Sequence, residues 1–349
     1  MRRWAKAPSP AYRWTVRRML SAAMATITSI LALILIGGRL GEWLPALDFL
    51  NNFTPIWLIV GMLSGTVWLI CRRARHWPLL VMTAMLVSGG AGILPEVIRS
   101  RGRPSALPHE TPVLRIVQFN TWKGNATPLI VARWLLDQRA DILFLDEVES
   151  DSPLLQVLAA AYPYKQTCGV EGRCSTLILA RVKPLASGGL ARDDPENRRG
   201  LSAAWMQLST RCGPVTAIAT HMSRPWPWSG AERDLRQLVA ALGTFDRKRV
   251  ILAGDFNLTP WTFRMRRQDA QLDLARATHA LPSWPSPLGL YGLPLPPLLP
   301  LDHIYTGASW QVADVTRGPV IGSDHYPLSA TIGERGCSDT KSDSRHVGM

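Results

Sequence analysis

The sequence predicts an α/β (α+β) domain in which sheets pack on each other with helices outside, preceded by about three transmembrane helices. Three observations predict this arrangement. Long uncharged apolar runs occur early in the chain. From residue 113 onward, apolar stretches of strand length far outnumber helical patterns, and the helices come singly between them. Layers of sheet and helix bury the apolar faces that such a sequence produces.

Three apolar runs near the N-terminus are long enough to cross a membrane. They cover residues 19–38, 49–71 and 77–95 and contain 20, 23 and 19 residues. A spanning helix needs roughly 20 apolar residues at ~1.5 Å each. A cleaved signal peptide is the alternative for the first run, but its apolar stretch is long and no small-x-small cleavage motif follows cleanly. The third run is the weakest, because small residues dilute it: Ser88, Gly89, Gly90 and Gly92.

The positive charge of the chain is concentrated beside these runs. Residues 1–110 hold 13 Lys or Arg and 4 Asp or Glu, whereas the remaining residues hold 26 and 22. Most of the net charge of +13 therefore lies next to apolar segments. Basic residues in that position set membrane topology and contact anionic lipid. A domain that binds nucleic acid would instead carry them on its own surface, so the pattern favours a membrane.

The loop charges predict an orientation. The first connection holds only Arg39 against Glu42 and Asp48. Basic residues cluster in the N-terminal tail and in the second connection: Arg2, Arg3, Lys6, Arg13, Arg17 and Arg18, then Arg72, Arg73 and Arg75. With three spans, the positive-inside rule places the C-terminal domain outside the cytoplasm. A further group of basic residues follows the third run and opposes this orientation: Arg99, Arg101 and Arg103. If the third run does not cross the membrane, the domain is predicted to be cytoplasmic.

These patterns divide the chain into four parts. Residues 1–99 are predicted to be a membrane anchor. Residues 100–112 are polar and contain proline, which is typical of a linker. Residues 113–332 form the predicted domain. Residues 333–349 are polar and are predicted to be disordered.

The first half of the domain alternates strands with short helices. Residues 113–119 and 141–145 are apolar runs of strand length. Between them Thr127 is a predicted N-cap and Pro128 the first helical residue, with the helix running to about Arg139. A second helix is expected over 154–161.

The second half is richer in strands. Ser229 and Glu232 form a predicted capping box, and the helix behind it places Leu235, Leu238, Val239 and Leu242 on one face. Residues 282–300 are apolar but contain too many prolines for regular structure. The remaining strands are predicted over residues 175–181, 203–208, 214–220, 250–253, 303–306 and 327–332.

Two cysteines offer a disulfide hypothesis. Cys168 and Cys174 are six residues apart around Gly169 and Gly172, a spacing that a hairpin could bridge. An oxidising compartment would permit the bond. The alternative is that the two thiols are unrelated, and the spacing does not decide between them.

Polar residues capable of chemistry recur at the strand ends. One such residue alone is more often part of a turn. Six sites at one edge of layered sheets, mixing carboxylates, amides and imidazoles, instead indicate an active site, because layered α/β folds build their sites at strand ends. The six sites are Asn120, Asp146-Glu147, His221, Asp255 with Asn257, Asp302-His303 and Ser323-Asp324-His325.

In this order the motifs resemble the endonuclease/exonuclease/phosphatase superfamily, and in particular its bacterial branch with membrane helices before the domain. The resemblance covers about residues 113–332. The most specific motifs are Gly254-Asp255-Phe256-Asn257 and Ser323-Asp324-His325. The others are Phe119-Asn120, Asp146-Glu147-Val148, Thr220-His221 and Asp302-His303-Ile304. The resemblance implies a four-layered α/β sandwich of two packed mixed sheets with outer helices.

The resemblance also implies residues that bind metal and phosphate. Glu147 would be the principal metal ligand, with Asn120 close by contacting metal-bound water or phosphate, and Asp324 would support the metal. Asn257 and His325 would hold phosphate oxygens. Mg²⁺, or Mn²⁺ in its place, is the implied cofactor, and such hard cations prefer oxygen ligands.

The implied proton chemistry involves four residues. Asp255 would orient or deprotonate the attacking water. His325 would donate to the phosphoryl oxygens, and Asp302 would orient that imidazole. His221 would act as the general acid on the leaving oxygen, which an imidazole can do near neutral pH.

The sequence departs from the family pattern at two positions. The family usually has Gln before the metal-binding Glu, whereas this chain has Asp146. Apurinic endonucleases carry an acidic residue two positions after the first Asn, whereas this chain has Trp122, which argues against abasic-site repair.

The sequence thus predicts a membrane-anchored, divalent-metal-dependent phosphoester hydrolase, a phosphodiesterase or a phosphatase. A lipid-linked ester is slightly favoured as substrate, and a nuclease is the less favoured alternative. The expected location is the bacterial inner membrane, crossed several times, with the domain on the periplasmic side. The competing hypothesis is a non-catalytic, membrane-tethered interaction module of the same fold. The sequence does not predict an oligomeric state.

Overall fold

The structure, a computed structural model, describes residues 10–72, 74–102, 107, 111–169, 174, 176–190, 201–290 and 292–336. The chain forms two compact units, Met1–Pro95 with Trp261–Arg264, and Glu96–Pro260 with Met265–Met349. Much of the predicted linker and most of the predicted disordered tail lie outside the described residues.

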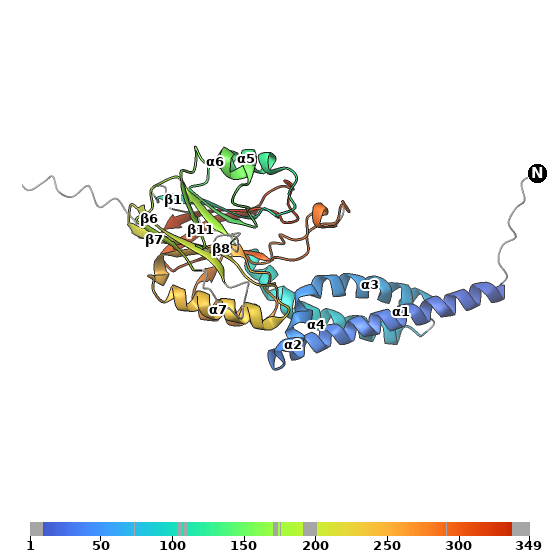
Figure 1. The fold of residues 1–349 in the computed structure, drawn as a ribbon. Coiled ribbons are helices and arrows are strands. Elements are labelled where there is room, and N and C mark those ends of the chain that lie inside the picture. Colours follow the sequence, from blue (N-terminus) through green and yellow to red (C-terminus); the bar gives the residue numbers. More distant parts are fainter. Residues whose placement is uncertain are drawn as a thin grey trace, which may run out of the picture. The chain divides into compact units, whose positions relative to one another are not determined.

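The first unit is helical (Figure 1). Its elements are α1 (Pro10–Arg39), η1 (Leu40–Glu42), α2 (Pro45–Asp48), η2 (Phe49–Phe53), α3 (Thr54–Cys71) and α4 (His76–Ser100), the last of which extends into the second unit. Three stretches are long and apolar enough to cross a membrane, Trp14–Glu42, Pro45–Cys71 and His76–Ser100. The third predicted run is therefore one continuous helix of 25 residues, despite its glycines.

The helices of this unit approach one another closely. A Cβ added to Gly61 would lie 1.8 Å from Met85 Cε, so the Met85 side chain packs directly on this glycine. The hydroxyls of Thr28 and Ser64 lie 2.9 Å apart in a buried hydrogen bond. The outward side chains, such as Leu33, are apolar and exposed. Small and hydroxyl residues inside with apolar residues outside are typical of helices packed in lipid.

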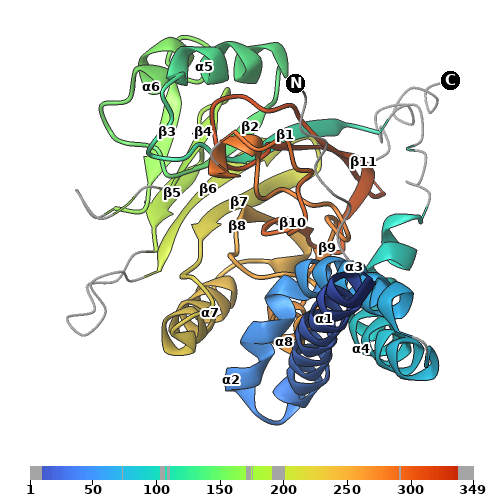
Figure 2. The ribbon, with the colours of Figure 1, turned by 90° about the vertical axis from the view of Figure 1, so that its right-hand side faces the viewer.

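The second unit contains two six-stranded sheets, shown from two directions in Figures 1 and 2. The first has the order β11-β12-β1-β2-β4-β3, with β11 (Trp310–Arg317), β12 (Leu328–Glu334), β1 (Val113–Asn120), β2 (Ile142–Asp146), β4 (Leu177–Ala180) and β3 (Tyr164–Thr167). The second has the order β5-β6-β7-β8-β10-β9, with β5 (Ala186–Gly189), β6 (Ser202–Thr210), β7 (Gly213–His221), β8 (Val250–Asp255), β10 (Asp302–Thr306) and β9 (Ala275–Arg276).

Both sheets are mixed, because each contains one parallel pair among antiparallel neighbours. The parallel pairs are β1 with β2 and β7 with β8. In each pair the two strands end together, so residues that follow them share one edge of the sandwich.

Three apolar clusters produce four layers. One cluster fills the space between the sheets and includes Phe144 and Ile251. A second packs the first sheet against α5 (Pro128–Asp137) and α6 (Pro153–Leu158), and a third packs the other sheet beneath α7 (Trp228–Leu242) and α8 (Phe263–Leu272). The four-layered sandwich predicted from the resemblance is confirmed.

The structure corrects and extends the predicted elements. Helix α7 begins at Trp228 with Pro227 as its N-cap, so Ser229 lies inside the first turn and the predicted capping box is wrong. The described residues of the segment 282–300 are irregular apart from the turn η4 (Pro287–Leu290) and one isolated bridge, as expected. In the second unit, four strands and one α-helix were not predicted: β3, β5, β9, β11 and α8.

The disulfide hypothesis is confirmed. Cys168 and Cys174 are bonded, with their Cα atoms 5.7 Å apart, between β3 and β4. The bond closes the hairpin whose second strand, β4, lies beside β2 in the first sheet.

Candidate active site

The pairing register brings the predicted strand-end residues to one edge. Asn120 is opposite Asp146 in the parallel pair of β1 and β2. His221 is opposite Asp255 in the pair of β7 and β8, and Asp302 on β10 is also opposite Asp255. Both sheets therefore present chemically capable side chains at the same edge of the sandwich.

Hydrogen bonds between the sheets hold this edge together. Asn120 Nδ2 donates to Asp255 Oδ2 at 3.0 Å, and the backbone N–H of Asp255 donates to Asp146 Oδ2 at 3.0 Å. Gln118 Nε2 donates to Asp302 Oδ1 at 2.9 Å. Each bond joins a residue of the first sheet to a residue of the second, so the site is positioned by both sheets.

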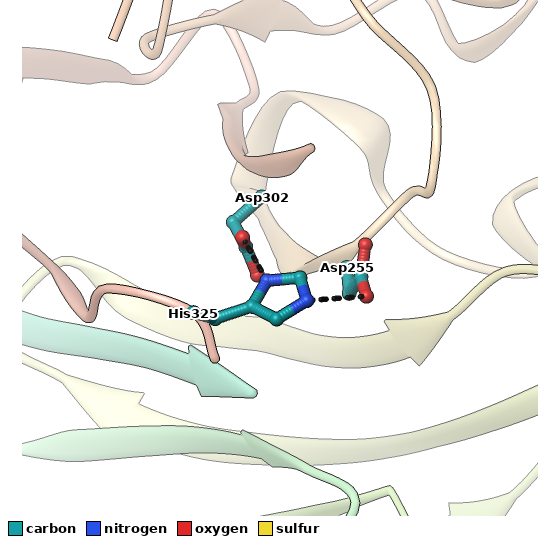
Figure 3. A group of neighbouring side chains, drawn as sticks. All are labelled: Asp255, Asp302 and His325. Carbon is teal, nitrogen blue, oxygen red and sulfur yellow. Dashed lines mark hydrogen bonds and ion pairs between the residues drawn. The ribbon is translucent and has the colours of Figure 1, made fainter. Parts of the chain in front are cut away.

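His325 lies between two carboxylates (Figure 3). Its Nδ1 is 2.7 Å from Asp302 Oδ2, and its Nε2 is 3.8 Å from Asp255 Oδ2. The loop that carries it is fixed by Ser323, whose hydroxyl donates to the carbonyl of Asn120 at 2.7 Å and accepts from the N–H of His325 at 3.0 Å. The imidazole is therefore held in one orientation.

The charges of this group are coupled. Burial alone would lower the pKa of His325, but the carboxylates of Asp302 and Asp255 raise it to about 10. Burial acts to raise the pKa of Asp302, but attraction to His325 together with hydrogen bonds from His325, Ser283 and Gln118 outweighs burial, and the pKa lies below its usual value. Burial raises the pKa of Asp255. At neutral pH the structure thus contains a buried imidazolium paired with Asp302.

Glu147 lies beside this group with a strained backbone. Its φ is +56°, in the left-handed region that residues other than glycine rarely adopt. Its Oε1 accepts from Asn120 Nδ2 at 3.3 Å, and its Oε2 accepts from the N–H of Lys123 at 3.3 Å. About a quarter of the side chain is exposed, so these oxygens can reach a ligand from solvent.

Asp324 supplies a further oxygen. Its Oδ2 accepts from Trp284 Nε1 at 3.4 Å, whereas its Oδ1 is buried and has no hydrogen-bond partner among the residues that the structure describes. Burial, together with the negative charge of Glu147, raises the pKa of Asp324. A buried acceptor of this kind needs a donor or a cation to offset its lost hydration.

The oxygens of Glu147, Asn120 and Asp324 fit a hard divalent cation such as Mg²⁺. Among the described residues, the ligand atoms of Asp255, Asp302 and His325 all lie within 4.8 Å of one another, which is the spacing that a metal ion requires. A cation there would have to displace the 2.7 Å hydrogen bond between His325 and Asp302. We therefore favour the oxygen-lined edge at Glu147.

His221 and Asn257 complete the arrangement. His221 Nε2 is 3.6 Å from Asp255 Oδ2 and 3.9 Å from Glu147 Oε1. Asn257 has a φ of +52°, donates its N–H to Asp255 Oδ1 at 2.8 Å, and donates from Nδ2 to the carbonyl of Met222 at 3.0 Å. All eight predicted site residues thus lie in one group.

Comparison with known proteins identifies the family. The model of the Endonuclease/Exonuclease/phosphatase family matches residues 117–325, which include every site residue described above. The chain belongs to this family. Its name groups nucleases with phosphatases, which hydrolyse phosphoesters. Among curated proteins, none matches the chain.

Several solved structures share the fold. The endonuclease/exonuclease/phosphatase from Beutenbergia cavernae has a TM-score of 0.52 at 18% identity, over 64% of this chain and 72% of that one. The protein from Bacteroides vulgatus has a TM-score of 0.51 at 18% identity, over 64% and 100%. A beta toxin mutant from Staphylococcus aureus, solved with bound magnesium ions, has a TM-score of 0.51 at 13% identity, over 63% and 99%.

Three residues that support the site in this family member were not predicted. Gln118 contacts Asp302, and the hydroxyl of Ser283 accepts from the backbone N–H of Asp302 at 3.1 Å. Thr176 donates to Asp146 Oδ1 at 2.9 Å. A signal existed only for Gln118, a polar residue in an apolar strand, two positions before Asn120 and so on the same face.

Asp146, which replaces the Gln usual in the family, is buried within this network. Burial is the main reason that its pKa rises to about 7. Its two oxygens accept from Thr176 and from the N–H of Asp255. The carboxylate therefore joins the two sheets beneath the site.

Proposed function

We propose that this chain is a membrane-anchored phosphoester hydrolase that depends on a divalent cation, Mg²⁺ or Mn²⁺. The single observation that carries the proposal is the grouping of oxygen ligands with a buried Asp–His pair. The cluster offers Glu147 Oε1 and Oε2 on one side and His325 with Asp302 on the other, with Asp255 between them. Membership of the family supports the reaction class.

The cation would be held by Glu147, Asn120 and Asp324. The magnesium ions bound to the beta toxin mutant of the same fold support this choice of metal. When bound, a divalent cation polarises the phosphoryl group and relieves its repulsion of a nucleophile. The buried Asp324 Oδ1 would then gain a partner.

Asp255 would orient and deprotonate the attacking water. Its raised pKa makes it a better proton acceptor than an ordinary carboxylate. Asn120 Nδ2 and the N–H of Asn257 donate to its two oxygens, which fixes the direction of the remaining lone pairs.

His325 would donate to a phosphoryl oxygen as negative charge develops in the transition state. Asp302 accepts from Nδ1, so Nε2 faces the substrate side of the site next to Asp255. Asn257 would hold a second phosphoryl oxygen with the Nδ2 hydrogen that Met222 does not use.

His221 would protonate the leaving oxygen. Its side chain is one-fifth exposed, at the mouth of the site, and lies close to both Asp255 and Glu147. An imidazole with this access can exchange its proton with solvent between turnovers.

We also propose that the three apolar helices anchor the protein in a bacterial inner membrane with the second unit on the periplasmic side. The distribution of basic residues supports this orientation. A lipid-linked ester is favoured as substrate over a nucleic acid, because residues 111–349 carry little net positive charge.

The proposal can be tested with the full chain in lipid nanodiscs containing Mg²⁺. The substrates would be bis(p-nitrophenyl) phosphate, p-nitrophenyl phosphate, plasmid DNA and phosphatidylglycerol. We expect hydrolysis of at least one substrate, which EDTA abolishes and added Mg²⁺ or Mn²⁺ restores. Asp255→Asn should lower the rate about 100- to 1,000-fold, whereas the same change at the exposed Asp137 should not. Folded protein that hydrolyses none of them would favour the non-catalytic interaction module.

A further inference from the structure

One loop of the second unit is apolar, has an exposed tip, and is attached at its base to the active site. Residues 283–301 contain no charged residue over 19 positions but include seven leucines and six prolines. A stretch of this composition on a protein surface generally marks a contact with another apolar medium.

The base of the loop is bonded to the site. Ser283 Oγ accepts from the N–H of Asp302, and Ser286 Oγ donates to the carbonyl of Ser323 at 2.6 Å. The N–H of Ser286 donates to the carbonyl of Asp324 at 2.7 Å. A Cβ at Gly289 would lie 3.0 Å from Asp324 Cβ, so the loop passes directly over this residue. The position of the loop and that of the catalytic residues are therefore linked.

The tip of the loop faces solvent. Leu288, Leu293 and Leu295 are 42%, 58% and 51% exposed, and every residue from Gly292 to Pro296 is exposed. Pro294 and Pro296 have no backbone N–H. The tip thus has fewer backbone N–H groups that must lose their bound water than an ordinary loop, which lowers the free-energy cost of entering hydrocarbon.

A second projection lies on another loop of the site. Trp226, five residues after His221, is 57% exposed. Two exposed cations accompany the site loops, Arg224 after His221 and Lys123 after Asn120. Tryptophan prefers the membrane–water interface, and basic residues pair with lipid phosphates at the same level.

A lipid surface fits these features better than a protein partner. The same chain carries three helices that can cross a membrane. Because β1 begins at Val113 and α4 ends at Ser100, the twelve residues between them reach at most about 40 Å, at ~3.3–3.6 Å each. The second unit therefore stays within reach of a bilayer that α4 crosses.

We propose that residues 283–301 form an interfacial loop whose apolar tip inserts into a lipid surface and holds the active site at the level of lipid phosphoesters. The proposal deepens the hydrolase function and rests on it for the choice of substrate. Insertion of the tip, in contrast, can be measured without any catalysis.

Photo-crosslinking tests the insertion. Leu293→p-benzoylphenylalanine would be made in the full chain, irradiated in membranes of the producing cells, and analysed by mass spectrometry. The matched control carries the same substitution at Leu185, which is 63% exposed and lies between β4 and β5. We expect lipid adducts at position 293 at least tenfold above those at 185. Equal lipid labelling at both positions, or labelling of position 293 by a protein, would overturn the proposal.

Kinetics test the substrate. Full-length protein in phosphatidylglycerol nanodiscs would be assayed on that lipid and on aqueous bis(p-nitrophenyl) phosphate. Leu293→Ser with Leu295→Ser should lower the ratio of lipid to aqueous rates at least tenfold, whereas Val182→Ser with Leu185→Ser should leave the ratio within twofold. An unaltered ratio in the first variant, or an aqueous rate without any lipid rate, contradicts the lipid substrate. Absence of both rates contradicts the hydrolase function itself, and the crosslinks then decide the insertion alone.

Discussion

Asp302 orients the imidazole of His325 and favours its protonated form. It lies at the start of β10, accepts from Gln118 through Oδ1 and pairs with His325 through Oδ2. Its own backbone N–H is fixed by Ser283. Two contacts of the side chain and one of the backbone leave Asp302 little freedom, as expected for a residue that positions a catalytic group.

Replacing Asp302 by Asn tests this role. Because the Asp302 carboxylate helps to raise the pKa of His325 to about 10, its removal should lower that pKa. His325 is cationic below its pKa, so the alkaline limb of the pH profile of kcat/KM should move to lower pH. At neutral pH we expect a loss of about 100- to 1,000-fold in kcat/KM.

Asp314→Asn is the matched control, since Asp314 is an exposed residue of β11. It should leave both the rate and the limb in place. If the alkaline limb of the kcat/KM profile of Asp302→Asn stays at the wild-type pH, Asp302 does not raise the pKa of His325.

At single residues, the sequence predicted the groups that end strands and missed those that support them. Asn120, His221 and Asp255 could be predicted, because each of these polar residues follows an apolar run in the sequence. The supporting roles of Ser283 and Thr176 could not be predicted, because their partners are 19 and 30 positions away in the sequence. Nothing in a local pattern reports a contact at that separation.

At the level of elements, the central strands were predictable and the edge elements were not. Strands β2 and β8 are buried on both faces, so their apolar runs are unbroken. The edge strand β5 reads Ala-Ser-Gly-Gly and is largely exposed, so hydrophobicity gave no signal. Helix α8 carries more polar than apolar residues and is defined by its packing in the third cluster.

The disulfide of the β3–β4 hairpin makes a prediction at this scale. Replacing Cys168 and Cys174 together by Ser removes the constraint on the unfolded chain, which for a seven-residue loop is worth about 2 kcal/mol. In a unit of this size we expect the Tm to fall by about 4–8 °C, measured by calorimetry of the full chain in detergent. Cys71→Ser, at a free cysteine, should leave the Tm within about 1 °C. A Tm that matches the wild type after the double replacement would exclude a stabilising bond.

At the scale of the whole molecule, the two units differ in where their apolar side chains lie, exposed to the surroundings or buried in the interior. The helical unit exposes many leucine, isoleucine and valine side chains, and its interior combines threonine and serine with a small apolar cluster. The sandwich buries its apolar residues in three clusters between and beneath its sheets. The sequence showed this division through hydropathy and charge alone, because both properties are local. The side of the membrane depends on the reality of each span and stays a prediction.

The proposed reaction requires the cation to bind at Glu147. Asp255, Asp302 and His325 have the spacing to bind one, but a cation there would displace the bond between His325 and Asp302, which a cation at Glu147 leaves intact. A crystal structure of the full chain with Mn²⁺, recorded at the manganese absorption edge, distinguishes them. We predict an anomalous peak within about 2.5 Å of a Glu147 carboxylate oxygen. A peak between Asp302 and His325, or no peak at millimolar Mn²⁺, would contradict it.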